Sequence, residues 1–310
     1  MFLIVTRNFP PEVGGIQMLM GGLSESFLNH GPVKVFTFEH ENSKKYDSKS
    51  SASIERVKGI KLFRKFRKAN LINDFINKHN NIRALIADHW KSLELIKTSK
   101  KKICLIHSKE INHKKGSFAN RRILKAFNNI DQVIANSEYT KNLAAEIGID
   151  ENKIIVINPG VFPVKEIEKS SIKEADNLLK KKSPRLITVS RFDKRKNHEK
   201  VIMALRNLKQ IYPNIIYTCV GYGEEEENIK KLTNELELSE NVMFLKNISQ
   251  NLKNALVSKS NLFVMPSIIH KTSVEGFGIA YVEAAQYGIP SIGGKDGGAS
   301  DAIKNNETGI

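Results

Sequence analysis

Short apolar runs alternate with longer amphipathic segments along almost the whole chain of 310 residues. Most of the runs are apolar throughout, which is typical of strands buried on both faces of a parallel sheet. Between them, segments such as His198–Lys209 carry one apolar stripe at helical spacing, formed there by Val201, Ile202, Leu205 and Leu208. This alternation predicts an α/β protein built from right-handed βαβ units.

The predicted strands fall into two groups. The first group is Phe2–Thr6, Val33–Phe38, Ile82–Ala87, Ile103–Ile106, Gln132–Asn136 and Ile154–Asn158. The second group is Arg185–Ser190, Ile215–Val220, Val242–Leu245, Leu262–Met265 and Ser291–Gly293. Between the groups, residues 161–184 are polar and rich in lysine. We therefore expect two Rossmann-like domains, residues 1–160 and 185–310, joined by a linker over residues 161–184 and facing a cleft that holds the ligands.

The ends of the chain and its cysteines indicate where such a protein would work. The N-terminus lacks the charged region and cleavage site of a signal peptide, and no apolar stretch approaches the roughly 20 residues that span a bilayer. Cys104 and Cys219 lie within apolar runs, so we expect buried thiols in a reducing compartment. These features predict a cytoplasmic protein. Because a further strand begins at Thr308-Gly309-Ile310, the second domain is expected to be incomplete.

The charge is strongly basic and unevenly distributed. The net charge is +16, and residues 1–163 hold 27 Lys and Arg against 15 Asp and Glu. Such a field favours acidic partners, namely anionic lipid, nucleic acid or a phosphorylated substrate. Nucleic acid is the least favoured of these, because no zinc-finger, RNP or basic-zipper pattern is present and the cations are spread over many segments.

One stretch, Arg56–Lys68, concentrates this charge and interleaves it with apolar residues such as Phe63 and Phe66. It could make peripheral contact with an anionic membrane. It could equally be a solvated basic face, and the sequence leaves both interpretations open.

Two loops after predicted strands carry residues suited to phosphate. Gly14-Gly15 stands at a strand-to-helix turn, where backbone N–H groups can approach an anion, although such a pair is more often only a turn. Arg191 and Lys196 follow the strand Arg185–Ser190, and would suit a diphosphate or form a solvated basic loop.

A third segment carries paired carboxylates. Glu275 lies in a glycine-flanked loop, and Glu283 follows eight residues later, about two turns into the next helix. We expect the N–H groups of Gly276, Phe277, Gly278 and Ile279 to form the N-terminus of that helix, which is a natural anion site.

Glu275 and Glu283 have the E-x7-E spacing of glycosyltransferase family 4, a retaining family with the GT-B fold, and the sequence resembles that family along nearly its whole length. The other matching segments, in chain order, are Gly14-Gly15, Asn158-Pro159-Gly160-Val161, SRFDKRKN with Arg191 and Lys196, and Val220-Gly221-Tyr222-Gly223. Residues 265–303 look most like the phosphatidylinositol mannosyltransferase branch, which uses GDP-mannose.

The resemblance implies a role for each matching residue. Arg191 and Lys196 would bind the diphosphate and stabilise charge on the leaving group. Glu275 would contact hydroxyls of the donor sugar, and Glu283 the ribose. His107 would contact the donor sugar near its anomeric carbon. The other donor-binding residues would be Gly14, Gly15, Gly221, Gly276, Phe277, Gly278 and Ile279.

The chain departs from that branch at His107-Ser108-Lys109-Glu110, where relatives tend to carry a glycine and a second histidine. This departure leaves the donor sugar and the acceptor open. No Asp-x-Asp motif occurs, so we expect neither a metal ion nor another cofactor, with Arg191 and Lys196 in the place of the cation.

The expected function is retaining transfer of a hexose to a lipid-linked or envelope-polysaccharide acceptor. The donor would be GDP-mannose, or a UDP-sugar that carries glucose or N-acetylglucosamine. The alternatives are a GT-B nucleotide-sugar epimerase and a catalytically weak fragment that only binds nucleotide sugar.

Overall fold

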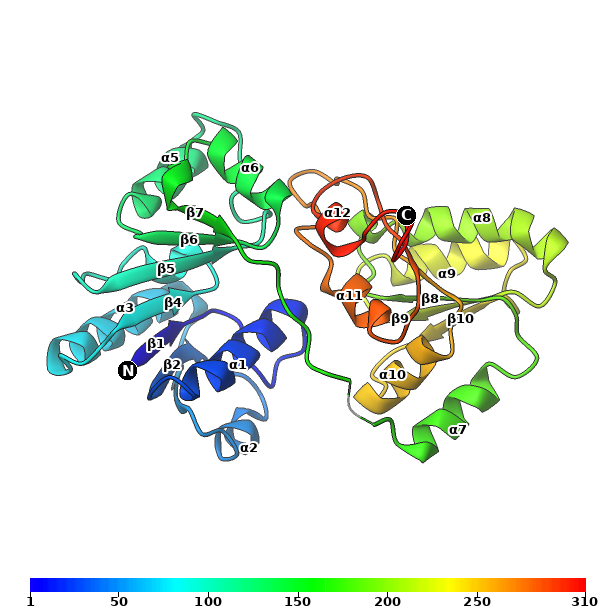
Figure 1. The fold of residues 1–310 in the computed structure, drawn as a ribbon, viewed down its shortest axis with the longest axis horizontal. Helices are drawn as coiled ribbons and strands as arrows, with labels where there is room; N and C mark the ends of the chain where they lie inside the picture. Colours follow the sequence, from blue (N-terminus) through cyan, green and yellow to red (C-terminus); the bar gives the residue numbers. More distant parts are fainter. Residues whose placement is uncertain (165) are drawn as a thin grey trace. The chain divides into compact units, whose positions relative to one another are not determined.

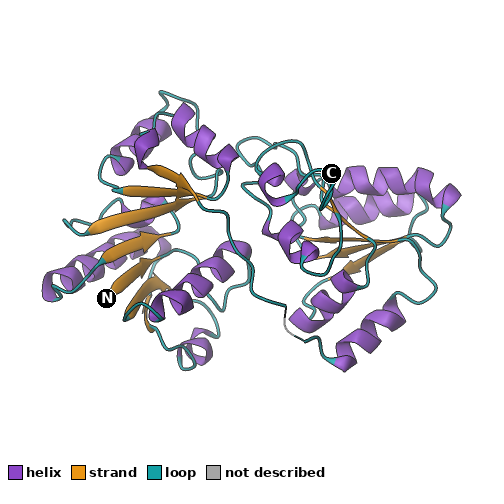
Figure 2. Ribbon diagram, viewed as in Figure 1, coloured by secondary structure: helices purple, strands orange, loops and turns teal. Residues whose placement is uncertain are grey.

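The computed structural model describes residues 1–164 and 166–310 and confirms the predicted α/β class. These residues divide into two compact units, Met1–Gly160 and Val161–Ile310. Each unit has its own parallel sheet covered by helices (Figure 2). Over the described residues, no helix is long and apolar enough to cross a membrane.

The first unit contains a seven-stranded sheet in the order β3-β2-β1-β4-β5-β6-β7. Its strands are β1 (Phe2–Val5), β2 (Val33–Phe38), β3 (Ser53–Val57), β4 (Ala84–Ala87), β5 (Lys101–Ile106), β6 (Gln132–Ala135) and β7 (Ile154–Val156). Its helices are α1 (Gly15–Leu28), α2 (Ser43–Asp47), α3 (Lys61–Lys78), α4 (Trp90–Leu93), α5 (Phe118–Phe127), α6 (Glu138–Glu146) and the short 3-10 helix η1 (Glu151–Lys153).

Both faces of this sheet are buried, as the apolar strands predict. One core packs α3, α4, α5 and α6 against the sheet, with Ile72, Trp90 and Ile123 among its members. The other core lies under α1, and includes Ile4 and Met20. Because the chain order reverses between β1 and β4, their carboxyl ends form the switch point at which α/β sheets bind ligands.

The second unit repeats this design with five strands in the order β10-β9-β8-β11-β12. The strands are β8 (Arg185–Val189), β9 (Ile216–Val220), β10 (Val242–Leu245), β11 (Leu262–Val264) and β12 (Ser291–Ile292). The helices are α7 (Lys169–Leu178), η2 (Lys194–Lys196), α8 (His198–Ile211), α9 (Glu226–Glu235), α10 (Gln250–Ser258), α11 (Ile279–Ala285) and α12 (Ala299–Ala302). Helices α8 and α9 lie on one side of this sheet, and α7 and α10 on the other (Figure 1).

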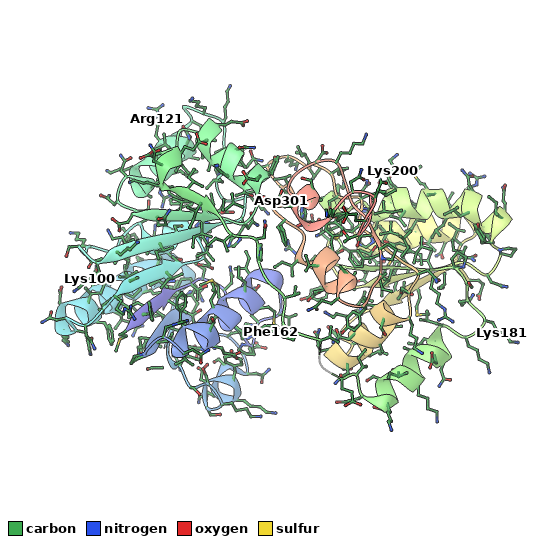
Figure 3. The ribbon with its side chains drawn as sticks, viewed as in Figure 1. Lys100, Arg121, Phe162, Lys181, Lys200 and Asp301 are labelled. Atoms are coloured by element: carbon green, nitrogen blue, oxygen red, sulfur yellow. The ribbon has the colours of Figure 1, made fainter. Side chains whose placement is uncertain are left out.

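All eleven predicted strands are present, some of them one or two residues shorter. The prediction missed β3, an edge strand whose sequence, Ser-Ile-Glu-Arg-Val, is mostly polar instead of apolar throughout. Cys104 and Cys219 are buried free thiols, as expected. The charged side chains of Arg121, Lys181 and Lys200 are exposed on the surfaces of their units (Figure 3).

Residues 161–184 are not a simple linker, because they contain α7. This helix packs against α10, and Ala175 and Leu179 join the core of the second unit. The many lysines of residues 161–184 made the short apolar stripe of α7 hard to recognise in the sequence. The two units meet at Gly160 and Val161, and Val161 onward belongs to the second unit.

The turn after β9 requires a glycine. Gly221 has a φ of 146°, and a Cβ there would collide with the carbonyl oxygen of Ser190, the residue that follows β8. The backbone of Gly221 also donates a hydrogen bond to Leu245 O at 2.8 Å. This close approach fixes the end of β9 against the end of β8.

We predict that Gly221→Ala lowers the free energy of unfolding by about 2 kcal/mol or more, because it adds both backbone strain and a clash with backbone atoms. The matched control is Gly160→Ala, since a Cβ at Gly160 would meet nothing within 4 Å. The control should stay within about 1 kcal/mol of the wild type. Urea unfolding followed by circular dichroism measures both, and equal stability of the two variants would contradict this packing.

Candidate active site

Two loops meet at the switch point of the second unit, where β8 and β11 are neighbours. The first loop leads from β8 through η2 into α8. The second, residues 265–278, leads from β11 to α11. The N–H of Ile268 in the second loop donates to the carbonyl oxygen of Arg195 in the first, at 2.9 Å. The side chain of Asn197 donates to Pro266 O at 3.1 Å, so the loops are fixed to each other at two points.

These loops bring Lys196 and Glu275 into direct contact. Lys196 Nζ lies 2.6 Å from Glu275 Oε2, and Arg195 Nη1 lies 2.6 Å from the same oxygen. The three side chains are between 10% and 12% exposed. Ser267 Oγ is 3.4 Å from Oε2. Arg195 is not among the predicted site residues, although it stands beside Lys196 in a run of three cations.

In the group formed by Arg195, Lys196 and Glu275, the opposite charges stabilise each other against the cost of burial. Burial by itself would raise the pKa of Glu275, but Lys196 and Arg195 more than offset this effect and hold the pKa at about 2. Burial lowers the pKa of Lys196, and Glu275 opposes that shift. At neutral pH Glu275 is therefore ionised. Two cations share one carboxylate, so the group retains positive charge for an anionic ligand.

Arg191, which was predicted to bind the diphosphate together with Lys196, is exposed to solvent. Its side chain is 74% exposed, and Nη2 lies 3.6 Å from Asp193 Oδ2. Asp193 also accepts a hydrogen bond from the backbone N–H of Lys196 at 3.3 Å and thereby caps η2. Arg191 is thus an accessible cation at the same turn, and Lys196 is the buried one.

A buried polar network positions the start of α8 beside this turn. His198 Nδ1 lies 2.8 Å from Tyr217 Oη, and His198 Nε2 lies 3.1 Å from Ser190 Oγ. The hydroxyl of Tyr217 also contacts Thr188 Oγ1 at 2.7 Å. Burial lowers the pKa of His198 to about 4, so its ring is neutral at physiological pH. We assign this network a structural role, because it ties β8, β9 and α8 together.

The second loop is shaped by its glycines and by Tyr281. Tyr281 Oη donates to Met265 O at 2.5 Å, which anchors α11 to the end of β11. A Cβ at Gly294 would collide with the backbone of Ser267, and one at Gly297 with the carbonyl oxygen of Glu275. Chain segments from after β12 therefore pack directly on the loop that carries Glu275.

Helix α11 begins later than the sequence predicted. It starts at Ile279, and its N-cap Gly278 is left-handed with a φ of 96°. Gly276 and Phe277 therefore precede the helix, and Phe277 is buried. Glu283 is consequently just over one turn into the helix rather than two. The glycine-rich motif made the helix start look earlier, because it does not reveal which glycine adopts the left-handed conformation.

Glu283 pairs with a cation that the sequence analysis had not connected with it. Lys253 Nζ on α10 lies 3.3 Å from Glu283 Oε2, and the Glu283 side chain is 39% exposed. A ribose would have to share or displace this ion pair. The contact between Glu283 and ribose remains a prediction.

The remaining predicted residues lie in the first unit. Gly14 is the N-cap of α1 and Gly15 its first residue, as the strand-to-helix turn predicted. His107 follows β5, and its backbone N–H donates to Glu110 Oε1 at 2.5 Å. Burial lowers the pKa of His107 to about 4 and raises that of Glu110 to about 7. His107 is thus a neutral ring at pH 7, and its Nε2 is buried without a partner among the described residues.

The sequence analysis missed a second buried group, at the switch point of the first unit. Lys68 reaches from α3 to donate to Thr6 O at 2.7 Å, and the backbone N–H of Arg7 contacts both oxygens of Asp88 at 3.2 and 3.3 Å. Burial lowers the pKa of Lys68 to about 8 and raises that of Asp88. Burial also lowers the pKa of the next residue, His89, to about 3. The signal was available, since Asp88-His89 follows β4 as His107 follows β5.

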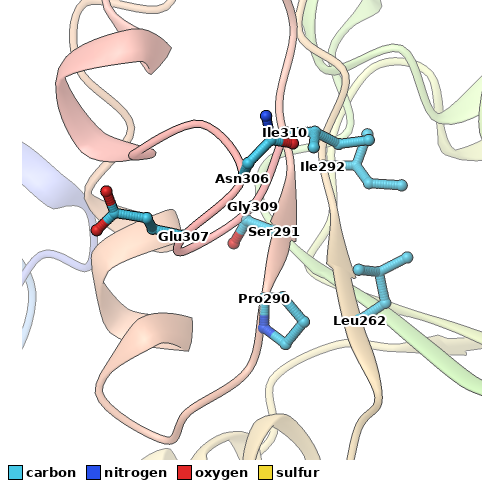
Figure 4. Close-up of a pocket in the computed structure, with 8 residues that line it drawn as sticks. All are labelled: Leu262, Pro290, Ser291, Ile292, Asn306, Glu307, Gly309 and Ile310. Carbon is cyan, nitrogen blue, oxygen red and sulfur yellow. The ribbon is translucent and has the colours of Figure 1, made fainter.

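The structure also contains a pocket that is separate from the predicted site residues. A pocket between β11, β12 and residues 306–310 is lined mainly by apolar groups such as Leu262 and Ile292, and contains none of the predicted site residues (Figure 4). Across residues 1–164 and 166–310, no group of three or more His, Cys, Asp or Glu is arranged to hold a metal ion. Independence of metal remains a prediction.

Comparison with known proteins gives the two units separate matches. Residues 13–164 match the family model "Glycosyltransferase Family 4", and residues 169–310 match "Glycosyl transferases group 1". A GDP-mannose-dependent alpha-(1-6)-phosphatidylinositol monomannoside mannosyltransferase of Mycolicibacterium smegmatis is 24% identical over 99% of this chain and 84% of its own. A GDP-mannose-dependent monoacylated alpha-(1-6)-phosphatidylinositol monomannoside mannosyltransferase of Corynebacterium glutamicum is 24% identical over 97% of this chain and 82% of its own.

Solved structures show the same fold. Anabaena Alr3699/HepE in complex with UDP has a TM-score of 0.80 at 18% identity, and the match covers 100% of this chain and 84% of that one. Sucrose-phosphate synthase from Thermosynechococcus elongatus has a TM-score of 0.76 at 20% identity, with 100% and 84% covered. Because the two family models together span nearly the whole chain and the fold agrees, the protein belongs to the GT-B glycosyltransferases, with a family 4 domain followed by a group 1 domain.

Proposed function

We propose that this glycosyltransferase transfers mannose from GDP-mannose, or the hexose of a UDP-sugar, to a lipid-linked or polysaccharide acceptor. The observation that carries the proposal is the buried pair of Lys196 and Glu275 at the switch point of the second unit. The mannosyltransferases named above support GDP-mannose and a lipid acceptor. The Anabaena protein, solved with UDP and with UDP-glucose, supports the UDP-sugar alternative.

The proposed chemistry follows from the charges at this site. When the bond from the anomeric carbon to the phosphate oxygen breaks, its electron pair stays on the phosphate and the sugar becomes positive. Lys196, with Arg191 at the same turn, would stabilise the negative charge that develops on the leaving diphosphate. Glu275 would accept hydrogen bonds from the sugar hydroxyls. The acceptor hydroxyl would form the new bond to the anomeric carbon and pass its proton to the departing phosphate oxygen, which has received the electron pair of the broken bond.

We predict that Lys196→Ala reduces kcat about 100-fold or more, because it removes a preorganised cation from the leaving group and leaves Glu275 with less compensation. The matched control is Lys194→Ala, an exposed lysine on the same short helix η2. Radiolabelled sugar transfer from GDP-mannose, UDP-glucose and UDP-N-acetylglucosamine measures both variants. Equal activity of Lys196→Ala and Lys194→Ala would contradict the assigned role.

We further propose that the reaction needs no metal ion, since Lys196 and Arg191 supply the positive charge at the diphosphate. We predict that transfer activity is unchanged after dialysis against EDTA, and that added Mg²⁺ or Mn²⁺ changes it less than twofold. Loss of activity in EDTA that either ion restores would show that a cation is part of the site.

We also propose that the first unit contacts an anionic membrane through a basic apolar patch at the start of α3. Its apolar members, Ile60, Leu62, Phe63 and Phe66, are between 47% and 74% exposed. The cations exposed among them are Lys58, Lys65 and Arg67. Exposed aromatic and aliphatic groups combined with cations fit the interface of a membrane that carries negative headgroups.

Not all cations of the stretch Arg56–Lys68 are available to a membrane. Arg56 turns inward and pairs with Asp47 at 2.8 Å, and Lys68 is buried. Arg64 packs over the ring of Phe38, at 4.0 Å from its centroid. These three residues are therefore structural, and we assign the patch to the exposed residues named above; the side chain of Lys61 lies outside the described part of the chain.

We predict that Phe63→Ser/Phe66→Ser reduces cosedimentation with phosphatidylglycerol-containing vesicles about tenfold, because it removes two rings from the bilayer interface. Ile211→Ser, at an apolar residue 69% exposed in the second unit, is the control and should bind as the wild type does. Wild-type protein that partitions equally into neutral and anionic vesicles would contradict the electrostatic part of the proposal. Unchanged binding of the double variant would exclude this patch.

A further inference from the structure

Arg195 contributes to the site in a way that its neighbours do not. It is the middle cation of Lys194-Arg195-Lys196, and its side chain is as buried as that of Lys196, whereas Lys194 is exposed. Its Nη1 lies 2.6 Å from Glu275 Oε2, and its Nη2 lies 3.8 Å from Asp193 Oδ2. Its backbone oxygen accepts a hydrogen bond from the N–H of Ile268 in the loop that carries Glu275. Arg195 is thus fixed by its backbone and by two carboxylates.

The contacts of Glu275 are one-sided. Arg195 Nη1, Lys196 Nζ and Ser267 Oγ all approach Oε2, at 2.6, 2.6 and 3.4 Å. Three side chains therefore converge on one oxygen of the Glu275 carboxylate. A carboxylate held through one oxygen presents the other in a fixed direction, which is the requirement for selecting one arrangement of sugar hydroxyls.

Arg195 and Lys196 contact the same oxygen of Glu275, but a bound diphosphate would affect their contacts differently. If Lys196 faces a diphosphate, its positive charge is shared with the phosphates and withdrawn in part from Glu275. A buried carboxylate that loses its partner is strongly destabilised. Arg195 would prevent this loss, because a rigid guanidinium can stay on Oε2 while a flexible lysine turns toward the ligand.

We propose that Arg195 is a positioning residue that orients Glu275 toward the donor sugar and leaves Lys196 available for the diphosphate. This inference rests on the proposed function for its ligand, and on the geometry of the ligand-free site for its physical basis. It predicts that loss of Arg195 weakens recognition of the sugar more than recognition of the nucleoside diphosphate.

The first test needs no ligand. We predict that Arg195→Gln raises the pKa of Glu275 by about 1 pH unit or more above its value of about 2, because a cation in direct contact is removed. Arg195→Lys should restore most of the difference. The matched control is Arg206→Gln, an exposed arginine on α8. The ¹³C signal of the Glu275 carboxyl, followed by NMR from pH 7 down to the acid limit of the folded state, measures each variant.

The second test compares ligands by calorimetry, using GDP with GDP-mannose and UDP with UDP-glucose. For the pair that the wild type binds, Arg195→Gln should reduce the affinity for the nucleotide sugar about tenfold more than the affinity for the nucleoside diphosphate. Arg195→Lys should lie between, and Arg206→Gln should match the wild type. A purely structural defect would weaken both ligands equally.

The outcomes separate the two proposals. A Glu275 titration that is the same in Arg195→Gln and in the wild type overturns the inference, and so does an equal loss of affinity for both ligands. A wild type that binds none of the four ligands overturns the proposed function. In that case the titration of Glu275 alone decides whether Arg195 controls this carboxylate.

Discussion

The buried carboxylate of Glu275 is the constraint around which the second unit is organised. It lies 2.6 Å from each of two cations, which keep it ionised in spite of its burial. The two loops that supply these groups are therefore tied to each other through backbone and side-chain hydrogen bonds. The glycines after β12 let neighbouring backbone pack on Glu275 and Ser267 without a gap. The network of His198 and Tyr217 then fixes the helix that follows the cations.

The first unit also has buried ionisable groups at its switch point, but they are different residues. Its sheet reverses order between β1 and β4, and there a buried lysine and a buried aspartate stand behind the strand ends. Lys68 is held by a backbone oxygen, and Asp88 by a backbone N–H. Burial shifts the pKa of each toward its neutral form. In the second unit, by contrast, Lys196 and Arg195 outweigh the effect of burial and hold Glu275 in its ionised form.

The sequence predicts most of the architecture, because buried parallel strands are apolar throughout and therefore easy to recognise. The resemblance assigns both Lys196 and Glu275 to the donor, but their direct contact is seen only in the structure. The sequence does not predict Arg195, because nothing in a run of three cations shows which side chain turns inward. The pairing of Glu283 with Lys253 was likewise invisible, since it depends on how α10 packs beside α11. Strand β3 and helix α7 were missed because polar residues mask their weak apolar patterns.

The central claim is that the switch point of the second unit binds a nucleoside diphosphate through Lys196. The most direct measurement is calorimetric titration of GDP, UDP and ADP into the wild-type protein and into an Arg191→Ala/Lys196→Ala variant. The account predicts that the wild type binds one of the three selectively, and that the variant loses this binding. Failure of the wild type to bind any of them, or equal binding by the variant, would contradict it.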